Sequence, residues 1–143
     1  MSYWDASALA KLYLAEPDSA QFESLALASP VVSGMLARHE MRTVFRRREA
    51  EAAIRGGEAA ALYRRIVSDA ASGVLRLQPD SDEVEREFGL VLERCFSQGP
   101  PLFIRTNDAL HLASARVAGE LEFVTADLRQ RAAAQLLGFT LLP

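Results

Sequence analysis

The chain has 143 residues and half of them are hydrophobic, which supplies a core for one domain and excludes a disordered chain. Its formal net charge of −3 excludes a general attraction to nucleic acid, so a polyanionic partner needs a local basic patch or a metal ion. The single cysteine excludes an internal disulfide. Because the chain has neither a signal-peptide pattern nor an apolar run of roughly 20 residues that could span a bilayer, we expect a cytoplasmic protein without membrane contact.

The first half of the chain alternates short apolar segments with amphipathic ones. Leu9, Leu12 and Tyr13 recur at helical spacing after an apolar opening, and the segment Glu16-Pro17-Asp18 interrupts that periodicity. The pair Gly56-Gly57 ends a long amphipathic helix. In chain order, these patterns predict a strand at 1–4, helices at 6–14 and 17–28, a strand at 30–33, and helices at 35–53 and 58–71.

The second half continues the same alternation. Gly73 ends the preceding helix, Ser81 caps the next one, and Gly99-Pro100-Pro101 marks an irregular loop. The predicted elements are a strand at 74–77, helices at 82–96 and 107–119, a strand at 121–125, a helix at 127–137 and a strand at 139–142. Strands that alternate with helices indicate an α/β fold, in which a central, mainly parallel sheet of about five short strands lies between two helical layers.

Four isolated carboxylates stand where strands or loops hand over to helices, or early in a helix: Asp5, Glu40, Asp108 and Asp127. Asp5 and Asp127 each follow a predicted strand, and ligands of parallel sheets bind beyond the carboxyl ends of the strands. Acids that converge there repel one another unless a cation joins them. Mg²⁺ and Mn²⁺ prefer such hard oxygen ligands, so convergence predicts metal-dependent cleavage of a phosphodiester without a serine, cysteine or histidine nucleophile.

Two of these acids also have a structural interpretation as helix caps. Asp5 precedes a helix and can accept hydrogen bonds from its first free amides, although Ser7 can do the same without it. Asp127 is followed three residues later by Gln130, which is the spacing of a capping box. The sequence leaves both interpretations open, and the metal-ligand interpretation gains weight only if the four acids meet.

The other two acids differ in their surroundings. Thr106 and Asn107 offer competing caps just before Asp108, so Asp108 is redundant for starting its helix and is free for a second role. Glu40 lies inside a helix with partly apolar neighbours. It is either an edge residue paired with Arg47 or a ligand that holds a metal ion directly or through water.

Basic residues accompany the predicted acidic site. Arg38, Arg42 and Arg46 recur every four positions on the helix that carries the glutamate. A solvated helix face explains such a run by default, but beside an acidic metal site the same run predicts contacts with RNA phosphates. Arg105, just before the third acid, is a separate candidate for a phosphate contact.

Several other kinds of site are excluded or disfavoured. The chain has no phosphate-binding or dinucleotide-binding glycine motif and no G-x-S-x-G nucleophile segment. One cysteine and two separated histidines exclude an ordinary structural zinc site. His111 follows Asp108 by three residues and is interpreted as a structural histidine, and Tyr3 is interpreted as a core aromatic.

Four segments carry a resemblance to a known family. They are YWDASALAKLYLAEP with Asp5, LARHEMRTVFRRR with Glu40, LFIRTNDALHLASA with Asp108, and LEFVTADLRQRAAAQLLG with Asp127 after Thr125. Together they resemble the acidic blocks of PIN-domain ribonucleases over nearly the whole chain. Within that family the chain is most similar to the VapC toxins of type II toxin–antitoxin pairs.

The resemblance implies a PIN-like fold for 1–143 as a single domain, with RNA as the substrate and Mg²⁺ or Mn²⁺ as the cofactor. It implies that all four acids are catalytic and hold the metal, with Asp5 and Asp108 as the main ligands. Ser7 and Thr125 would orient the carboxylates through hydrogen bonds. It further implies a homodimer, inhibited by a small VapB-like antitoxin that contributes any contact with operator DNA.

Two alternatives remain open. The first is a stand-alone PIN nuclease for RNA processing without an antitoxin, which the absence of a short upstream reading frame would favour. The second is a non-enzymatic acidic metal-binding module, such as a response-regulator receiver. Receivers need paired early acids and a late lysine, whereas here the only lysine is Lys11 and Asp5 has no acidic neighbour. A phosphatase of the D-x-D type fails for the same reason, because Asp5-Ala6-Ser7 lacks the second acid.

Overall fold

The computed structural model describes residues 1–143 and contains five strands and seven helices in the order that the sequence predicts. The strands are β1 (Ser2–Trp4), β2 (Val31–Gly34), β3 (Leu75–Gln78), β4 (Glu122–Val124) and β5 (Thr140–Leu142). The helices are α1 (Ala6–Ala10), α2 (Ser19–Ala28), α3 (Met35–Ala50), α4 (Glu58–Ser72), α5 (Asp82–Phe96), α6 (Thr106–Val117) and α7 (Leu128–Leu136). All strands pair in parallel, in the order β3-β2-β1-β4-β5, so the predicted α/β fold is confirmed.

Two predicted helices are shorter than expected. The helix predicted at 6–14 is a regular α-helix only to Ala10, and the amides of Lys11, Leu12 and Tyr13 then bond to the carbonyl three residues back, which tightens the chain into turns. The helix predicted at 35–53 ends at Ala50, shortly before Ala52 adopts a φ of 56°. None of the seven helices combines the length and the apolar character needed to cross a membrane.

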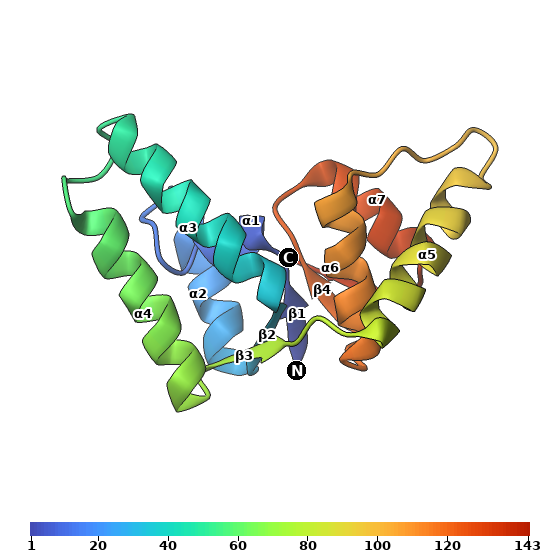
Figure 1. The fold of residues 1–143 in the computed structure, drawn as a ribbon, viewed down its shortest axis with the longest axis horizontal. Coiled ribbons are helices and arrows are strands. Elements are labelled where there is room, and N and C mark those ends of the chain that lie inside the picture. The colour runs from blue at the N-terminus through green and yellow to red at the C-terminus, as the bar shows by residue number, and fades with distance from the viewer.

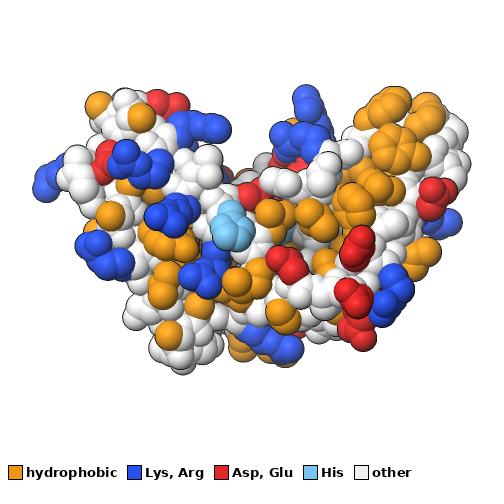
Figure 2. Space-filling model, in the orientation of Figure 1, with side chains coloured by type: hydrophobic (Ala, Val, Ile, Leu, Met, Phe, Trp, Pro, Cys, Tyr) orange, Lys and Arg blue, Asp and Glu red, His pale blue; other side chains and the backbone are white.

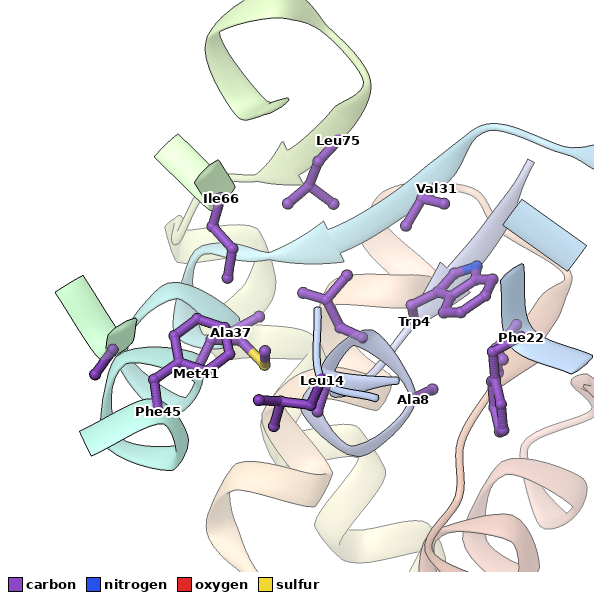
Figure 3. Packing of buried hydrophobic residues seen from close by; sticks show 14 residues of the cluster. Trp4, Ala8, Leu14, Phe22, Val31, Ala37, Met41, Phe45, Ile66 and Leu75 are labelled. Carbon is purple, nitrogen blue, oxygen red and sulfur yellow. The ribbon is translucent and has the colours of Figure 1, made fainter. Parts of the chain in front are cut away.

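The sheet lies between two helical layers, each with its own hydrophobic cluster. Strand side chains alternate between the two faces, so Trp4 and Val31 pack among residues of α1 to α4, whereas Tyr3 and Val32 pack among residues of α5 to α7. Figure 3 shows the first cluster, in which Trp4 and Val31 lie on the side of Phe22 of α2, and Leu75 lies toward Ile66 of α4. Because both faces are covered, β1 and β2 are buried along their whole length, whereas the edge strand β3 alternates leucine with polar residues.

The sheet changes direction at β1. The chain builds β1, β2 and β3 outward on one side and then returns to place β4 and β5 on the other side. This reversal creates a topological switch point between β1 and β4, where side chains that follow the two strands meet in parallel sheets. Figure 1 shows α3 and α4 as one arm and α5, α6 and α7 as the other, and Figure 2 shows that the surface is hollowed between the arms.

Candidate active site

Asp5 occupies the switch point between β1 and β4. Its amide donates to the carbonyl of Val124 at 3.2 Å, which fixes the backbone beside the end of β4. Its Oδ1 accepts from the amide of Ala8 and from the hydroxyl of Ser7, both at 2.8 Å, and its Oδ2 accepts from the Thr125 hydroxyl at 2.5 Å. Asp5 therefore does cap α1, and it is held at the same time from a strand 120 residues away.

The Asp5 carboxylate carries a buried charge with no basic partner. Its residue is 2% exposed, and no ion pair of the structure includes it. Burial raises the pKa of Asp5, and the charge of His111 and the three hydrogen bonds offset this only in part. A desolvated carboxylate at the mouth of a parallel sheet is suited to an added cation.

Ser7 and Thr125 tie the ends of β1 and β4 together around this carboxylate. The Ser7 hydroxyl donates to Asp5 and accepts from the amide of Ala126 at 3.0 Å, so of the two alternative caps of α1 it is Asp5, and not Ser7, that takes the role. The Thr125 hydroxyl donates to Asp5 and accepts from the amide of Asp127 at 3.0 Å. The two hydroxyls lie 3.4 Å apart, and each of them fixes one carboxylate oxygen of Asp5.

Asp108 and Asp127 face each other across one guanidinium group. Nε of Arg105 donates to Oδ2 of Asp108 at 2.9 Å, and Nη2 of Arg105 donates to Oδ2 of Asp127 at 2.8 Å. Oδ1 of Asp127 also accepts from the amide of Arg129 at 2.8 Å and so caps α7. The start of α6 and the start of α7 are thereby drawn together at the same edge of the sheet.

The other expected caps at these helices are wrong. Arg105 is the N-cap residue of α6 and makes no side-chain cap, so neither Thr106 nor Asn107 takes that role. Asn107 instead donates to Oε1 of Glu40 at 3.1 Å. Gln130 forms no capping box, because its side-chain amide Nε2 donates to the backbone carbonyl of Asp108 at 3.2 Å. These polar side chains join neighbouring elements rather than satisfy their own helices.

Glu40 projects from α3 toward α6 and is bonded there, so its alternative pairing with Arg47 is wrong. Its Oε2 lies 2.5 Å from Nε2 of His111, and Nδ1 of His111 lies 3.0 Å from the hydroxyl of Tyr3. An ionised carboxylate can only accept, so Nε2 of His111 carries a proton and donates to Glu40, while Nδ1 pairs with the Tyr3 hydroxyl. Tyr3, His111 and Glu40 therefore form one continuous relay from the core to the site.

The relay favours the charged form of Glu40. Burial opposes ionisation, but the hydrogen bond and charge of His111, with smaller contributions from Asn107 and Arg105, outweigh it and lower the pKa of Glu40. Tyr3, Asn107 and His111 are the site residues that sequence reasoning missed. His111 had a usable signal, because its position three residues after Asp108 places it on the same side of α6.

The arginines of α3 lie beside this site on the arm that Figure 2 shows covered with basic side chains. Arg38 is half-buried, with Nη2 3.5 Å from the Tyr63 hydroxyl, and the Arg42 guanidinium stacks 5.0 Å from the centre of the Tyr63 ring. Arg46 is exposed and pairs with Glu49. A shallow hollow on this helix is lined by His39, Arg42, Thr43, Arg46, Arg47 and Ala50.

The four acids have the right chemistry for a hard divalent cation, but their arrangement is not closed around one. No three acidic, histidine or cysteine side chains lie close enough together to hold a metal ion. Two acids share Arg105, Glu40 is held by His111 and Asn107, and Asp5 is the one of the four that forms no ion pair. The carboxylate oxygens are suitable ligands for Mg²⁺ or Mn²⁺, and the guanidinium of Arg105 lies between Asp108 and Asp127.

Comparisons with known proteins agree with this architecture. The profile of the PIN domain matches residues 2–136. Similar solved structures include VapC20 of Mycobacterium tuberculosis, a sarcin–ricin loop cleaving toxin, with 22% identity, a TM-score of 0.72, and coverage of 98% of this chain and 97% of that one.

Two further structures belong to the Fit system. FitAcB from Neisseria gonorrhoeae gives 14% identity, a TM-score of 0.73, and coverage of 100% and 97% of the two chains. FitAB bound to an IR36 DNA fragment gives 15% identity, a TM-score of 0.71, and coverage of 99% and 94%. At these identities the three structures show the shared fold. No curated protein sequence matches the chain significantly.

Proposed function

The chain belongs to the PIN-domain family, whose nucleases generally use a divalent metal, and we propose that it is a metal-dependent endoribonuclease that serves as the toxin of a type II toxin–antitoxin pair. One observation carries the proposal. Asp5 lies buried and without a basic partner at the switch point of the sheet, where Asp108, Asp127 and Glu40 lie on the elements around it. Burying this carboxylate costs stability, and its hydrogen bonds to the Ala8 amide and to the two hydroxyls offset that cost only in part.

Asp5 and Asp108 would be the main ligands of Mg²⁺ or Mn²⁺, and Glu40 and Asp127 would complete the site directly or through water. A bound cation supplies Lewis-acid chemistry, namely charge stabilisation at the phosphate and activation of water. Ser7 and Thr125 hold both oxygens of Asp5 in place, which limits the reorganisation needed on binding. His111 keeps Glu40 charged and oriented through its hydrogen bond.

RNA would approach along α3, because the protein as a whole is negatively charged and attraction must be local. Arg42, Arg46 and the half-buried Arg38 point to contacts with the phosphate backbone, which position a nucleic acid without reading its bases. Arg105 is a further candidate for a phosphate contact at the site itself. The tyrosine beneath Arg42 helps to fix that guanidinium on the surface.

The toxin assignment rests on the structures that this fold resembles. VapC20 is a toxin that cleaves the sarcin–ricin loop, and FitAB is a complex bound to DNA. By analogy, we propose a homodimer that is inhibited by a small VapB-like antitoxin, with operator DNA contacted through that antitoxin. Expression of the chain alone should arrest growth, and co-expression with the product of a short adjacent reading frame should relieve that arrest. Failure of every such partner would favour the stand-alone nuclease.

The nuclease is tested by incubating the purified protein and Asp108→Asn with structured RNAs in Mn²⁺, Mg²⁺ or EDTA. We expect wild-type cleavage in either metal, none in EDTA, and a loss of at least about a hundredfold in the variant, since each carboxylate stabilises charge at the reacting centre.

Asp80→Asn is the matched control, because Asp80 is exposed and its side chain makes no hydrogen bond or ion pair. Cleavage that persists in EDTA, or that Asp108→Asn retains in full, would overturn the proposal. An equal loss in Asp80→Asn would show that the effect belongs to the overall charge and not to the site.

A further inference from the structure

We infer that Arg105 is a built-in counter-ion that holds the acidic site together without metal and must leave before a divalent cation can bind. The inference rests on the proposed metal-dependent function. It goes beyond that function, because it assigns two roles to the chain's own arginine. Arg105 would lower the affinity for the metal, and it would contact RNA only after the metal has displaced it.

The contacts of Arg105 support this role. Its Nε and Nη2 atoms donate separately to Asp108 and Asp127, at 2.9 and 2.8 Å, so the planar group bridges two acids that start different helices. No other side chain with a permanent positive charge contacts Asp108 or Asp127. The charge of Arg105 also reaches Glu40 and helps to keep that carboxylate ionised.

The same position excludes a metal ion that uses both acids. Oδ2 of Asp108 and Oδ2 of Asp127 both accept from the guanidinium, and the acids do not close around any common centre. A cation bound between them would face a positive charge at hydrogen-bonding distance from its own ligands, which is strongly unfavourable. Metal binding and the arginine bridge are therefore alternatives.

Arg105 is free to move when it is displaced. Its side chain is 64% exposed, and its ion pairs are made only with these two acids. Its backbone lies directly before α6. The released guanidinium would remain beside the site, where it can contact a substrate phosphate, so displacement by metal and contact with RNA would follow in that order.

The experiment is a titration of Mn²⁺ at low ionic strength into wild type, Arg105→Gln and Arg129→Gln, followed by calorimetry and by thermal melting. Arg129→Gln is the matched control, because it removes the same charge two residues from Asp127, from an exposed side chain without hydrogen bond or ion pair. We expect Arg105→Gln to bind Mn²⁺ about tenfold more tightly than wild type, and Arg129→Gln to stay within about twofold.

Thermal melting adds a readout that does not depend on cleavage. In EDTA, Arg105→Gln should melt a few degrees below wild type because Asp108 and Asp127 then repel each other, and Mn²⁺ should reverse that order. Equal Mn²⁺ affinity in wild type and Arg105→Gln, an equal gain in Arg129→Gln, or no binding by any variant would overturn the inference. Tighter binding by Arg105→Gln with no RNA cleavage by wild type would uphold it and reject the proposed nuclease instead.

Discussion

Asp5 caps α1 and at the same time places a buried carboxylate at the candidate site. It accepts three hydrogen bonds, yet burial still raises its pKa, so the native protein holds the Asp5 proton up to a higher pH than the unfolded chain does. The sign of the pH effect follows. As pH rises from the ordinary carboxyl range through the raised native pKa, the unfolded chain releases its proton first, and native stability falls.

The variant Asp5→Asn should therefore be more stable than wild type in EDTA, by a few degrees of melting temperature near neutral pH, because it removes the desolvated charge. The gain should be small in acid, grow as pH rises, and level off above the native pKa. Denaturation at a series of pH values measures it. Added Mn²⁺ should stabilise wild type and leave the variant unchanged; a variant that is less stable than wild type at every pH would contradict this account.

Gly34 affects the position of Tyr3 because it has no side chain at a point of close approach. Its φ of −92° suits any residue, but an added Cβ would lie 2.7 Å from the Tyr3 hydroxyl and 3.3 Å from Oγ of Ser114. Gly34→Ala should therefore push the Tyr3 hydroxyl away from His111 and loosen Glu40, at a cost of about 1–3 kcal/mol in the free energy of unfolding.

Urea denaturation measures this cost, with Gly89→Ala as control. Gly89 lies inside α5 with no atom near an added Cβ, so that substitution should stabilise the protein by about 0.5–1 kcal/mol. If Gly34→Ala changes stability as little as a surface substitution, the relay does not depend on this close approach.

At the scale of elements, α3 carries both the acid Glu40 and the basic surface. The buried face of the helix, including Met41 and Phe45, anchors it to the sheet, and the exposed face presents Arg42 and Arg46. This division lets the outer residues change without disturbing the core.

Arg46→Gln should weaken RNA binding for all sequences alike and lower the slope of log affinity against log salt by about 0.7, the value for one phosphate contact of a single strand. Filter binding of Asp108→Asn carrying this change, over a range of salt concentrations, measures the slope without cleavage. Arg86→Gln on α5 is the control, because Arg86 is also exposed but lies on the other arm. The same loss in both variants would mean that net charge, and not α3, attracts the RNA.

At the scale of the whole molecule, periodicity and capping residues predict the element order well. Every strand and helix was expected within a few residues, because Gly, Pro and Ser81 mark the ends of elements locally. The meeting of Asp5 with the end of β4 was also expected, since it follows from the topology of a parallel sheet.

What the sequence does not contain is the rotation of one helix against another and the choice of rotamers. The arginine bridge joins Arg105 to Asp127, 22 residues away, and the relay joins Glu40 to His111, 71 residues away. Neither pairing leaves a local pattern. Both arise from the packing of α6 against α3 and α7, and only the spacing of Asp108 and His111 on one helix hinted at them.

The separation of Asp5 from Thr125 has a consequence for the biosynthesis of this protein. The ribosome adds Asp5 to the chain 120 residues before Thr125, whose hydroxyl fixes it. β4 must then pair with β1 to bring Asp127 to the site. A growing chain that has emerged only as far as α6 still lacks Thr125, which fixes Asp5, and the fourth acid, Asp127. The proposed hydrolytic site is therefore complete only once translation has passed β4, and the proposed antitoxin would meet the chain in its finished fold.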